Sequence, residues 1–134
     1  MKTLLVLEDE PSLMKLLRHT LKHYSLIEAV SAEEALLLFI DYDYRVDLLL
    51  ADLTLPTISG IQVAIHLRSK IPDLPVILTS GYPISGWSDK NSADLRRLGA
   101  SSVAVLQKPF PGQELLDAIC DLTGWPQAGK ARTA

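Results

Sequence analysis

Residues 46–56 read VDLLLADLTLP, where five of the first six residues are apolar and a single carboxylate, Asp52, comes next. A continuous apolar run that ends in turn residues is typical of a strand buried on both faces, in a parallel sheet covered by helices. Ligands of open parallel sheets bind just beyond the carboxyl ends of the strands. Asp52 is therefore predicted to lie where such a sheet carries its chemistry, although an Asp here can also simply begin a turn.

The composition is that of one folded domain without strong basic charge. The chain has 134 residues, of which 48% are hydrophobic and 22% are charged, so we expect a single core. The net charge of −3 argues against a nucleic-acid-binding surface, and the single cysteine, Cys120, excludes an internal disulfide framework. The apolar run after Met1 is too short for a signal peptide or a membrane span, so a cytoplasmic location is predicted.

Apolar runs and helix-start signals alternate on both sides of the 46–56 stretch. The predicted strands cover residues 3–7, 25–30, 46–52, 75–80 and 102–107. The predicted helices run from 11 to about 23, from 32 to about 40, from 60 to about 70, from 92 to 98 and from 112 to 122. Strands that alternate with helices in this way build a right-handed, doubly wound parallel sheet.

Charged and hydroxyl side chains gather at the carboxyl ends of the predicted strands. These side chains belong to Glu8, Asp9, Asp52, Ser80 and Lys108. Three neighbouring carboxylates repel one another, and a hard divalent cation such as Mg²⁺ neutralises them through oxygen ligands. A metal, a lysine, a hydroxyl and a carboxylate nucleophile together suit phosphoryl transfer through an aspartyl phosphate. Taken singly, the acidic residues could instead favour a helix N-terminus, and Lys108 and Ser80 could be a surface lysine and a turn residue.

Several motifs, taken in this order, resemble the receiver domain of bacterial two-component response regulators. They are residues 7–11 (LEDEP), Asp52 followed by Pro56 and Gly60, residues 75–80 (PVILTS) and residues 108–110 (KPF). The resemblance covers residues 2–122, so we expect a receiver domain over residues 1–123 and a flexible tail over residues 124–134. It implies the flavodoxin-like α/β fold, a (βα)5 architecture whose five-stranded parallel sheet has the order 2-1-3-4-5.

The resemblance also implies a role for each residue of the predicted site. Asp52 is expected to accept a phosphoryl group from the phosphohistidine of a histidine kinase or a phosphotransfer protein. Asp9 is expected to bind Mg²⁺ directly, with Glu8 in the outer part of the acidic pair, and the backbone carbonyl of Thr54 is a further expected ligand. Lys108 is expected to pair with the phosphoryl group.

The switch hydroxyl and its neighbours are assigned by the same resemblance. Ser80 is expected to bond the new phosphoryl oxygen, whereas alternation along the strand points its rival Thr79 to the other face. Gly81 matches the small residue that keeps the pocket open. The peptide bond between Lys108 and Pro109 is expected to be cis, as is typical of the family.

Two departures from the family pattern concern the expected output face. Val105 stands three residues before Lys108, where the family commonly has an aromatic residue, so output through another motion is expected. The region between Ser80 and Lys108 is also longer than usual. The shape of the output face, and any dimer formed through it, are therefore not carried over from the family.

Other functions are open on the same residues. A phosphorylation-independent docking module on the receiver fold is favoured by Val105 but opposed by the complete acidic triad. A phosphatase of the haloacid dehalogenase type would need an Asp in place of Thr54. A flavin or nucleotide binder would need glycine-rich phosphate loops, which the sequence lacks.

The length of the chain after the last predicted helix bears on its partners. Twelve residues follow Leu122, too few for a DNA-binding domain. We therefore expect either a stand-alone receiver or the receiver portion of a hybrid histidine kinase. In both cases the predicted partners are proteins, with the downstream partner unknown, without direct DNA or membrane binding, and with the chain as a monomer or weak homodimer.

Overall fold

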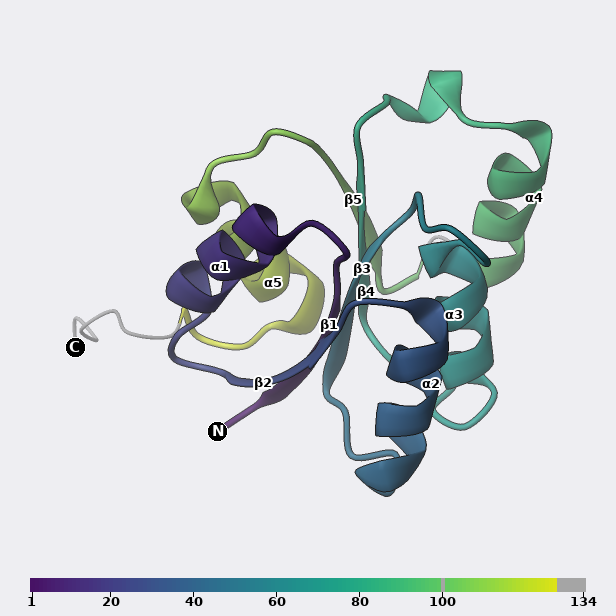
Figure 1. Cartoon of the computed structure of the whole chain (residues 1–134). Coiled ribbons are helices and arrows are strands. Elements are labelled where there is room, and N and C mark those ends of the chain that lie inside the picture. The colour runs from purple at the N-terminus through teal and green to yellow at the C-terminus, as the bar shows by residue number, and fades with distance from the viewer. Residues whose placement is uncertain (100, 128–134) are drawn as a thin grey trace.

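Five parallel strands form one sheet in the order β2-β1-β3-β4-β5, which confirms the predicted flavodoxin-like architecture (Figure 1). The computed structural model describes residues 1–99 and 101–127. The strands are β1 (Thr3–Leu7), β2 (Ser25–Ala29), β3 (Leu48–Asp52), β4 (Val76–Ser80) and β5 (Val103–Gln107). The helices are α1 (Pro11–Thr20), α2 (Ala32–Asp41), α3 (Gly60–Arg68), α4 (Asp89–Leu98) and α5 (Gly112–Thr123), with a 3-10 turn, η1, at Ile84–Gly86.

Helices cover both faces of the sheet, with α1 and α5 on one face and α2, α3 and α4 on the other (Figure 1). Strand β3 is buried along its whole length. Its residues Leu48 and Leu50 join the apolar cluster under α1 and α5, and Leu49 and Ala51 join the cluster on the opposite face. Because successive side chains point to opposite faces, the apolar run of β3 supplies both cores at once. None of the helices in the described ranges is long and apolar enough to cross a membrane.

The fourth helix begins earlier than the sequence analysis predicts. The predicted helix starts at Ser92, whereas α4 starts at Asp89. Ser88 is the N-cap, and its hydroxyl oxygen accepts a hydrogen bond from the Asn91 N–H at 3.1 Å. A serine in this position satisfies one of the free N–H groups of the first helical turn. The loop between β4 and α4 is therefore shorter in the structure than the sequence predicts, and it contains η1.

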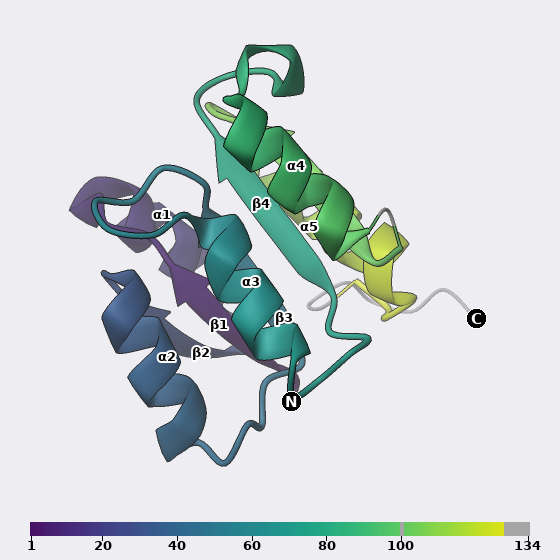
Figure 2. The same ribbon diagram turned by 90° about the vertical axis from the view of Figure 1, so that its right-hand side faces the viewer.

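Helix α4 packs beside α3 (Figure 2). The face of β5 toward α4 is incompletely covered, because Val103 and Val105 are partly exposed, whereas every residue of β4 is buried. An apolar cavity therefore lies between α4 and β5.

The start of the predicted tail packs against the domain. Of residues 124–134, the structure describes residues 124–127, and residues 128–134 lie outside the described part. The Trp125 ring lies 6.3 Å from the Tyr24 ring between centroids, and Lys2 Nζ lies 5.1 Å from the centroid of the Trp125 ring. Trp125, the second residue of the segment predicted to be a flexible tail, therefore contacts the folded domain.

Candidate functional site

Three acidic side chains lie together beyond the carboxyl ends of β1 and β3. Glu8 and Asp9 follow β1, and Asp52 is the last residue of β3. The two strands are neighbours in the sheet, so their parallel pairing brings these distant chain positions to one edge. Each carboxylate contributes one oxygen to a group whose members all lie within 4.8 Å of one another. The predicted acidic cluster is therefore present as a geometric arrangement.

The members of the cluster differ in their exposure. Glu8 and Asp52 are buried, whereas Asp9 is exposed. Burial raises the pKa of Glu8 above its ordinary value, and the hydrogen bonds from Lys108 and from the Glu10 N–H, the latter at 3.0 Å, only partly oppose this effect. In this site the burial of Glu8 disfavours its charged form, whereas Asp9 faces solvent.

Lys108 bridges the two buried carboxylates. Its Nζ donates to Glu8 Oε1 and to Asp52 Oδ2, both at 3.0 Å. Burial disfavours the ammonium charge, but the hydrogen bonds to the two carboxylates outweigh this effect and raise the pKa of Lys108. The Lys108–Pro109 peptide bond is cis, as expected, and the Lys108 N–H donates to the Ser80 carbonyl oxygen at 2.7 Å. The lysine is thus tied to β4 by its backbone and to the acidic cluster by its side chain.

The backbone around Asp52 is fixed by its neighbours. The Thr54 N–H donates to Asp52 Oδ1 at 3.1 Å, and the Leu53 N–H donates to the Thr79 carbonyl oxygen at 2.8 Å. Gly60, the first residue of α3, lies directly against this segment, because an added Cβ would come within 2.3 Å of the Asp52 backbone oxygen. Only a glycine allows α3 to begin this close to the end of β3.

The hydroxyl predicted to act as a switch lies at the end of β4. Ser80 is fully buried, and its hydroxyl oxygen accepts a hydrogen bond from the Tyr82 N–H at 3.0 Å. Thr79 is also buried and pairs with Asp52 across the sheet, but its side chain points away from that of Ser80 because strand side chains alternate. A Cβ on Gly81 would meet nothing within 4 Å, so the space beside the site is open.

One support of the site was missed by the sequence analysis. The Thr57 hydroxyl, in the loop between β3 and α3, donates to Glu33 Oε1 of α2 at 2.6 Å. This contact ties the loop that follows Asp52 to the neighbouring helix. No local pattern predicts it, because the two residues are far apart in the sequence and meet only in the folded sheet.

The donor set of the acidic cluster fits a hard divalent cation. Glu8, Asp9 and Asp52 offer carboxylate oxygens, which are the ligands that Mg²⁺ prefers. The described ranges contain no histidine or cysteine in this cluster, so a softer metal is not favoured.

The chain is similar to known proteins over most of its length. Residues 4–120 match the response regulator receiver domain. The chain is 35% identical over 118 residues to the two-component response regulator PhoP of Pseudomonas aeruginosa, which covers 84% of this chain and 47% of that protein. It is 31% identical over 122 residues to the response regulator GtcR of Aneurinibacillus migulanus, which covers 88% of this chain and 46% of that protein. The signal receiver domain of an HD domain-containing protein from Pseudomonas fluorescens Pf-5 has a TM-score of 0.77 and 26% identity, over 92% of this chain and 94% of that one.

The chain therefore belongs to the response regulator receiver domain family. Receiver domains are regulatory domains that use Mg²⁺ and interact with histidine kinases or phosphotransfer proteins. The chain spans less than half of the length of the two curated relatives named above.

Proposed function

We propose that this receiver domain accepts a phosphoryl group on Asp52 from the phosphohistidine of a histidine kinase or a phosphotransfer protein, and that the modification changes its protein–protein interactions. The observation that carries the proposal is the bridge of Lys108 between Glu8 and Asp52, with Asp9 beside them. An ammonium and a cluster of metal-binding carboxylates around one buried Asp are what phosphoryl transfer requires, because catalysis there is mostly positioning and charge neutralisation.

The proposed nucleophile is held in position before a partner arrives. A carboxylate oxygen of Asp52 attacks the phosphorus atom, the bond between phosphorus and the partner's imidazole nitrogen breaks, and the imidazole leaves with the bonding electron pair. The Thr54 N–H orients Oδ1 and Lys108 Nζ orients Oδ2. Glu8, Asp9, Asp52 and the backbone carbonyl of Thr54 would hold Mg²⁺, which would supply positive charge against the phosphoryl oxygens.

Three residues receive the new phosphoryl group. Lys108 exchanges a contact with the Asp52 carboxylate for one with a phosphoryl oxygen. The Ser80 O–H donates to a second phosphoryl oxygen, and Gly81 leaves the space that the group needs. These residues assist only the phosphorylation and dephosphorylation of the domain itself, so its role is regulatory rather than enzymatic.

A partner surface lies beside Lys108. A hollow of about 320 Å³ is lined by residues of α1 and of the segment after β5, including Leu13, Leu16 and Phe110. It gives a phosphorylated partner an apolar surface next to the site. A cytoplasmic location, the absence of direct DNA binding and a monomeric or weakly dimeric state stay predictions.

The test is the intact mass of the protein after incubation with acetyl phosphate, with and without Mg²⁺. We expect a Mg²⁺-dependent gain of one phosphoryl group that Asp52→Asn abolishes and that Asp121→Asn, a control at an exposed position on α5, retains. An adduct that persists in Asp52→Asn, or no adduct at all, would contradict the proposal. Such a result would favour the phosphorylation-independent docking module, whose support is the small, half-buried Val105 on the uncovered part of β5.

A further inference from the structure

The loop after β4 connects the Ser80 hydroxyl to an aromatic residue. The Tyr82 N–H donates to Ser80 Oγ at 3.0 Å, and the Tyr82 carbonyl oxygen accepts a hydrogen bond from Trp87 Nε1 at 3.3 Å. Trp87 is buried in the core, whereas Tyr82 is 62% exposed. The backbone of Tyr82 is thus held between a buried hydroxyl and a buried indole while its ring lies in solvent.

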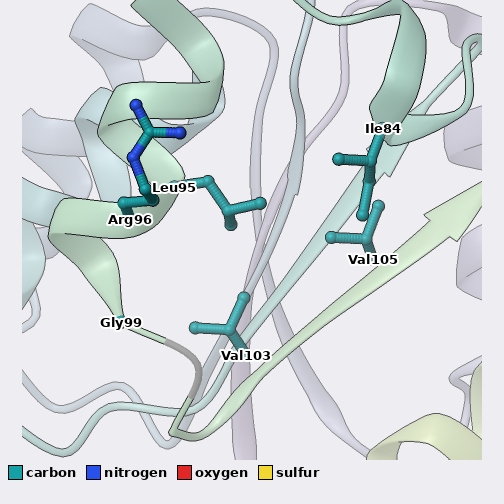
Figure 3. A pocket seen from close by; sticks show the side chains of 6 residues that line it. All are labelled: Ile84, Leu95, Arg96, Gly99, Val103 and Val105. Atoms are coloured by element: carbon teal, nitrogen blue, oxygen red, sulfur yellow. The ribbon is translucent and has the colours of Figure 1, made fainter.

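An apolar cavity of about 600 Å³ lies beside this loop, between α4 and β5. Figure 3 shows Ile84 of η1 next to Val105 at one end of the cavity, with Leu95 of α4 and Val103 of β5 around the remaining space. Among the described residues that line it, Arg96 carries the only charged side chain. Because Val105 is a small residue, β5 does not fill this space itself.

The exposed ring and the open cavity complement each other. A tyrosine ring is a large apolar surface with a polar tip, and its transfer from water to an aliphatic pocket is favourable when the hydroxyl keeps a polar partner. The cavity offers aliphatic walls and one guanidinium. Tyr82 is two residues from Ile84, which already lines the cavity, so the ring needs only a local change of the loop to reach it.

We propose that Tyr82 is the aromatic switch residue of this chain, and that its ring enters the cavity between α4 and β5 when the Ser80 hydroxyl turns to the phosphoryl group on Asp52. The inference rests on the proposed function of Asp52 and adds how the site communicates with the surface. When Ser80 Oγ moves toward Asp52, its hydrogen bond from the Tyr82 N–H moves with it or breaks, and both changes displace the Tyr82 backbone. The hydrogen bond from the buried Trp87 indole holds the carbonyl oxygen of Tyr82, so a displacement of the Tyr82 N–H turns this residue about its held carbonyl.

The test follows the exposure of Tyr82 directly in the whole chain. The protein is labelled with 3-fluorotyrosine, and Tyr82→Phe identifies the Tyr82 signal among the four tyrosines by ¹⁹F NMR. A soluble gadolinium chelate broadens the signals of exposed rings. The broadening is measured before and during incubation with acetyl phosphate and Mg²⁺, and the intact mass of the same sample reports phosphorylation. Tyr42, exposed after α2 and far from the loop in the chain, is the internal control.

We expect the phosphorylated protein to lose the broadening of the Tyr82 signal while that of Tyr42 keeps its size. A phosphoryl adduct with Tyr82 still broadened would overturn the inference and leave the proposed function intact; it would also be the result if a partner, rather than Tyr82, filled the cavity. No adduct would overturn the proposed function and this inference with it.

A second variant tests the cavity as the destination of the ring. Val105→Phe places a ring in the cavity from β5, at a half-buried position with space beside it. We expect this variant to gain the phosphoryl group but to keep the Tyr82 signal broadened. If the Tyr82 signal of phosphorylated Val105→Phe were protected as in the wild type, the ring would have to move elsewhere and the inference would be wrong.

Discussion

At the scale of single residues, the site balances buried carboxylates against one ammonium. Glu8 and Asp52 both accept a hydrogen bond from Lys108 Nζ, so a single ammonium charge lies against two carboxylates. The desolvation of buried charges is costly, and a metal-free site of this kind is not optimised for stability. A cation that binds to these carboxylates would offset the free energy that their desolvation costs, so the cost is expected at a cation-binding site.

The replacement Glu8→Gln distinguishes the effect of the buried carboxylate on stability from its proposed role in binding Mg²⁺. Because burial raises the pKa of Glu8 above its ordinary value of 4.5, the folded protein binds the Glu8 proton more tightly than the unfolded chain does. The charged form therefore costs stability at neutral pH, and this cost disappears as the pH falls through the raised pKa toward 4.5. In EDTA at pH 7 we expect Glu8→Gln to raise the free energy of unfolding by about 1 kcal/mol.

This stability difference should shrink as the pH is lowered, and Mg²⁺ should stabilise the wild type more than the variant. Denaturant titrations at several pH values, with EDTA or with Mg²⁺, measure both effects. A variant that is less stable than the wild type at pH 7 in EDTA, or that Mg²⁺ stabilises equally, would contradict the expectation.

The replacement Lys108→Met tests the ammonium itself. The variant keeps an unbranched side chain of similar shape but leaves Glu8 and Asp52 without their shared cation, so we expect a loss of about 3 kcal/mol in the free energy of unfolding. The rate of phosphorylation by acetyl phosphate should fall by about 10²-fold, the typical effect of removing one donor that stabilises developing charge. Lys90→Met, at an exposed position on α4, is the control. A wild-type rate in Lys108→Met would remove Lys108 from the proposed reaction.

At the scale of the elements, the site depends on how closely α3 follows β3. Gly60→Ala places a methyl group within 2.3 Å of the Asp52 backbone oxygen, so the start of α3 or the end of β3 must shift. We expect a loss of about 3 kcal/mol in the free energy of unfolding, at the upper end of the range for overpacking. Gly81→Ala is the control, because its added methyl group meets nothing within 4 Å. Equal denaturation midpoints for the two variants would show that the approach of α3 is not tight.

The same scale shows what the sequence can predict. Local signals give the elements: the apolar run of β3 gives a doubly buried strand, and Ser31 caps α2 where the capping pattern predicts it. The start of α4 was predicted too late, although Ser88 carries an N-cap signal, because the glycines, prolines and serines before it read as one continuous loop. The strand order then places Glu8, Asp9 and Asp52 at one edge without further information.

At the scale of the whole molecule, contacts between distant segments were not predictable. The sequence analysis places Lys108 at the same sheet edge as Glu8 and Asp52, but it does not give the hydrogen bonds that join them. The packing of Trp125 on Tyr24 and the contact of Thr57 with Glu33 join residues that no local pattern relates. Sequence periodicity reports which face of an element is apolar, but it does not report which polar atom of a remote loop will lie opposite. Such contacts therefore become visible only in the folded chain.

The Arg68 side chain connects several segments of the fold through hydrogen bonds to their backbone carbonyl oxygens. At the end of α3 it donates to the carbonyl oxygens of Leu74, Leu98, Ser101 and Ser102, at distances of 2.7 to 3.1 Å. It thereby ties α3 to the segment before β4 and to the connection between α4 and β5. Burial lowers the pKa of Arg68 below its ordinary value, but the guanidinium stays charged at neutral pH.

Arg68→Lys keeps the charge but removes the planar fork that reaches several carbonyls at once. The bonds to the Leu74 and Leu98 carbonyl oxygens are partly buried, and a buried carbonyl left without a partner costs about 1–3 kcal/mol, so we expect the free energy of unfolding to fall by about 2 kcal/mol. Arg45→Lys, at an exposed position, should leave it unchanged. Because Arg68 contacts residues before β4 and β5 rather than after them, the fraction of folded Arg68→Lys that gains a phosphoryl group should equal that of the wild type. Denaturant unfolding and intact mass measure the two quantities, and wild-type stability or a selective loss of phosphorylation would contradict the assignment of Arg68 to the fold alone.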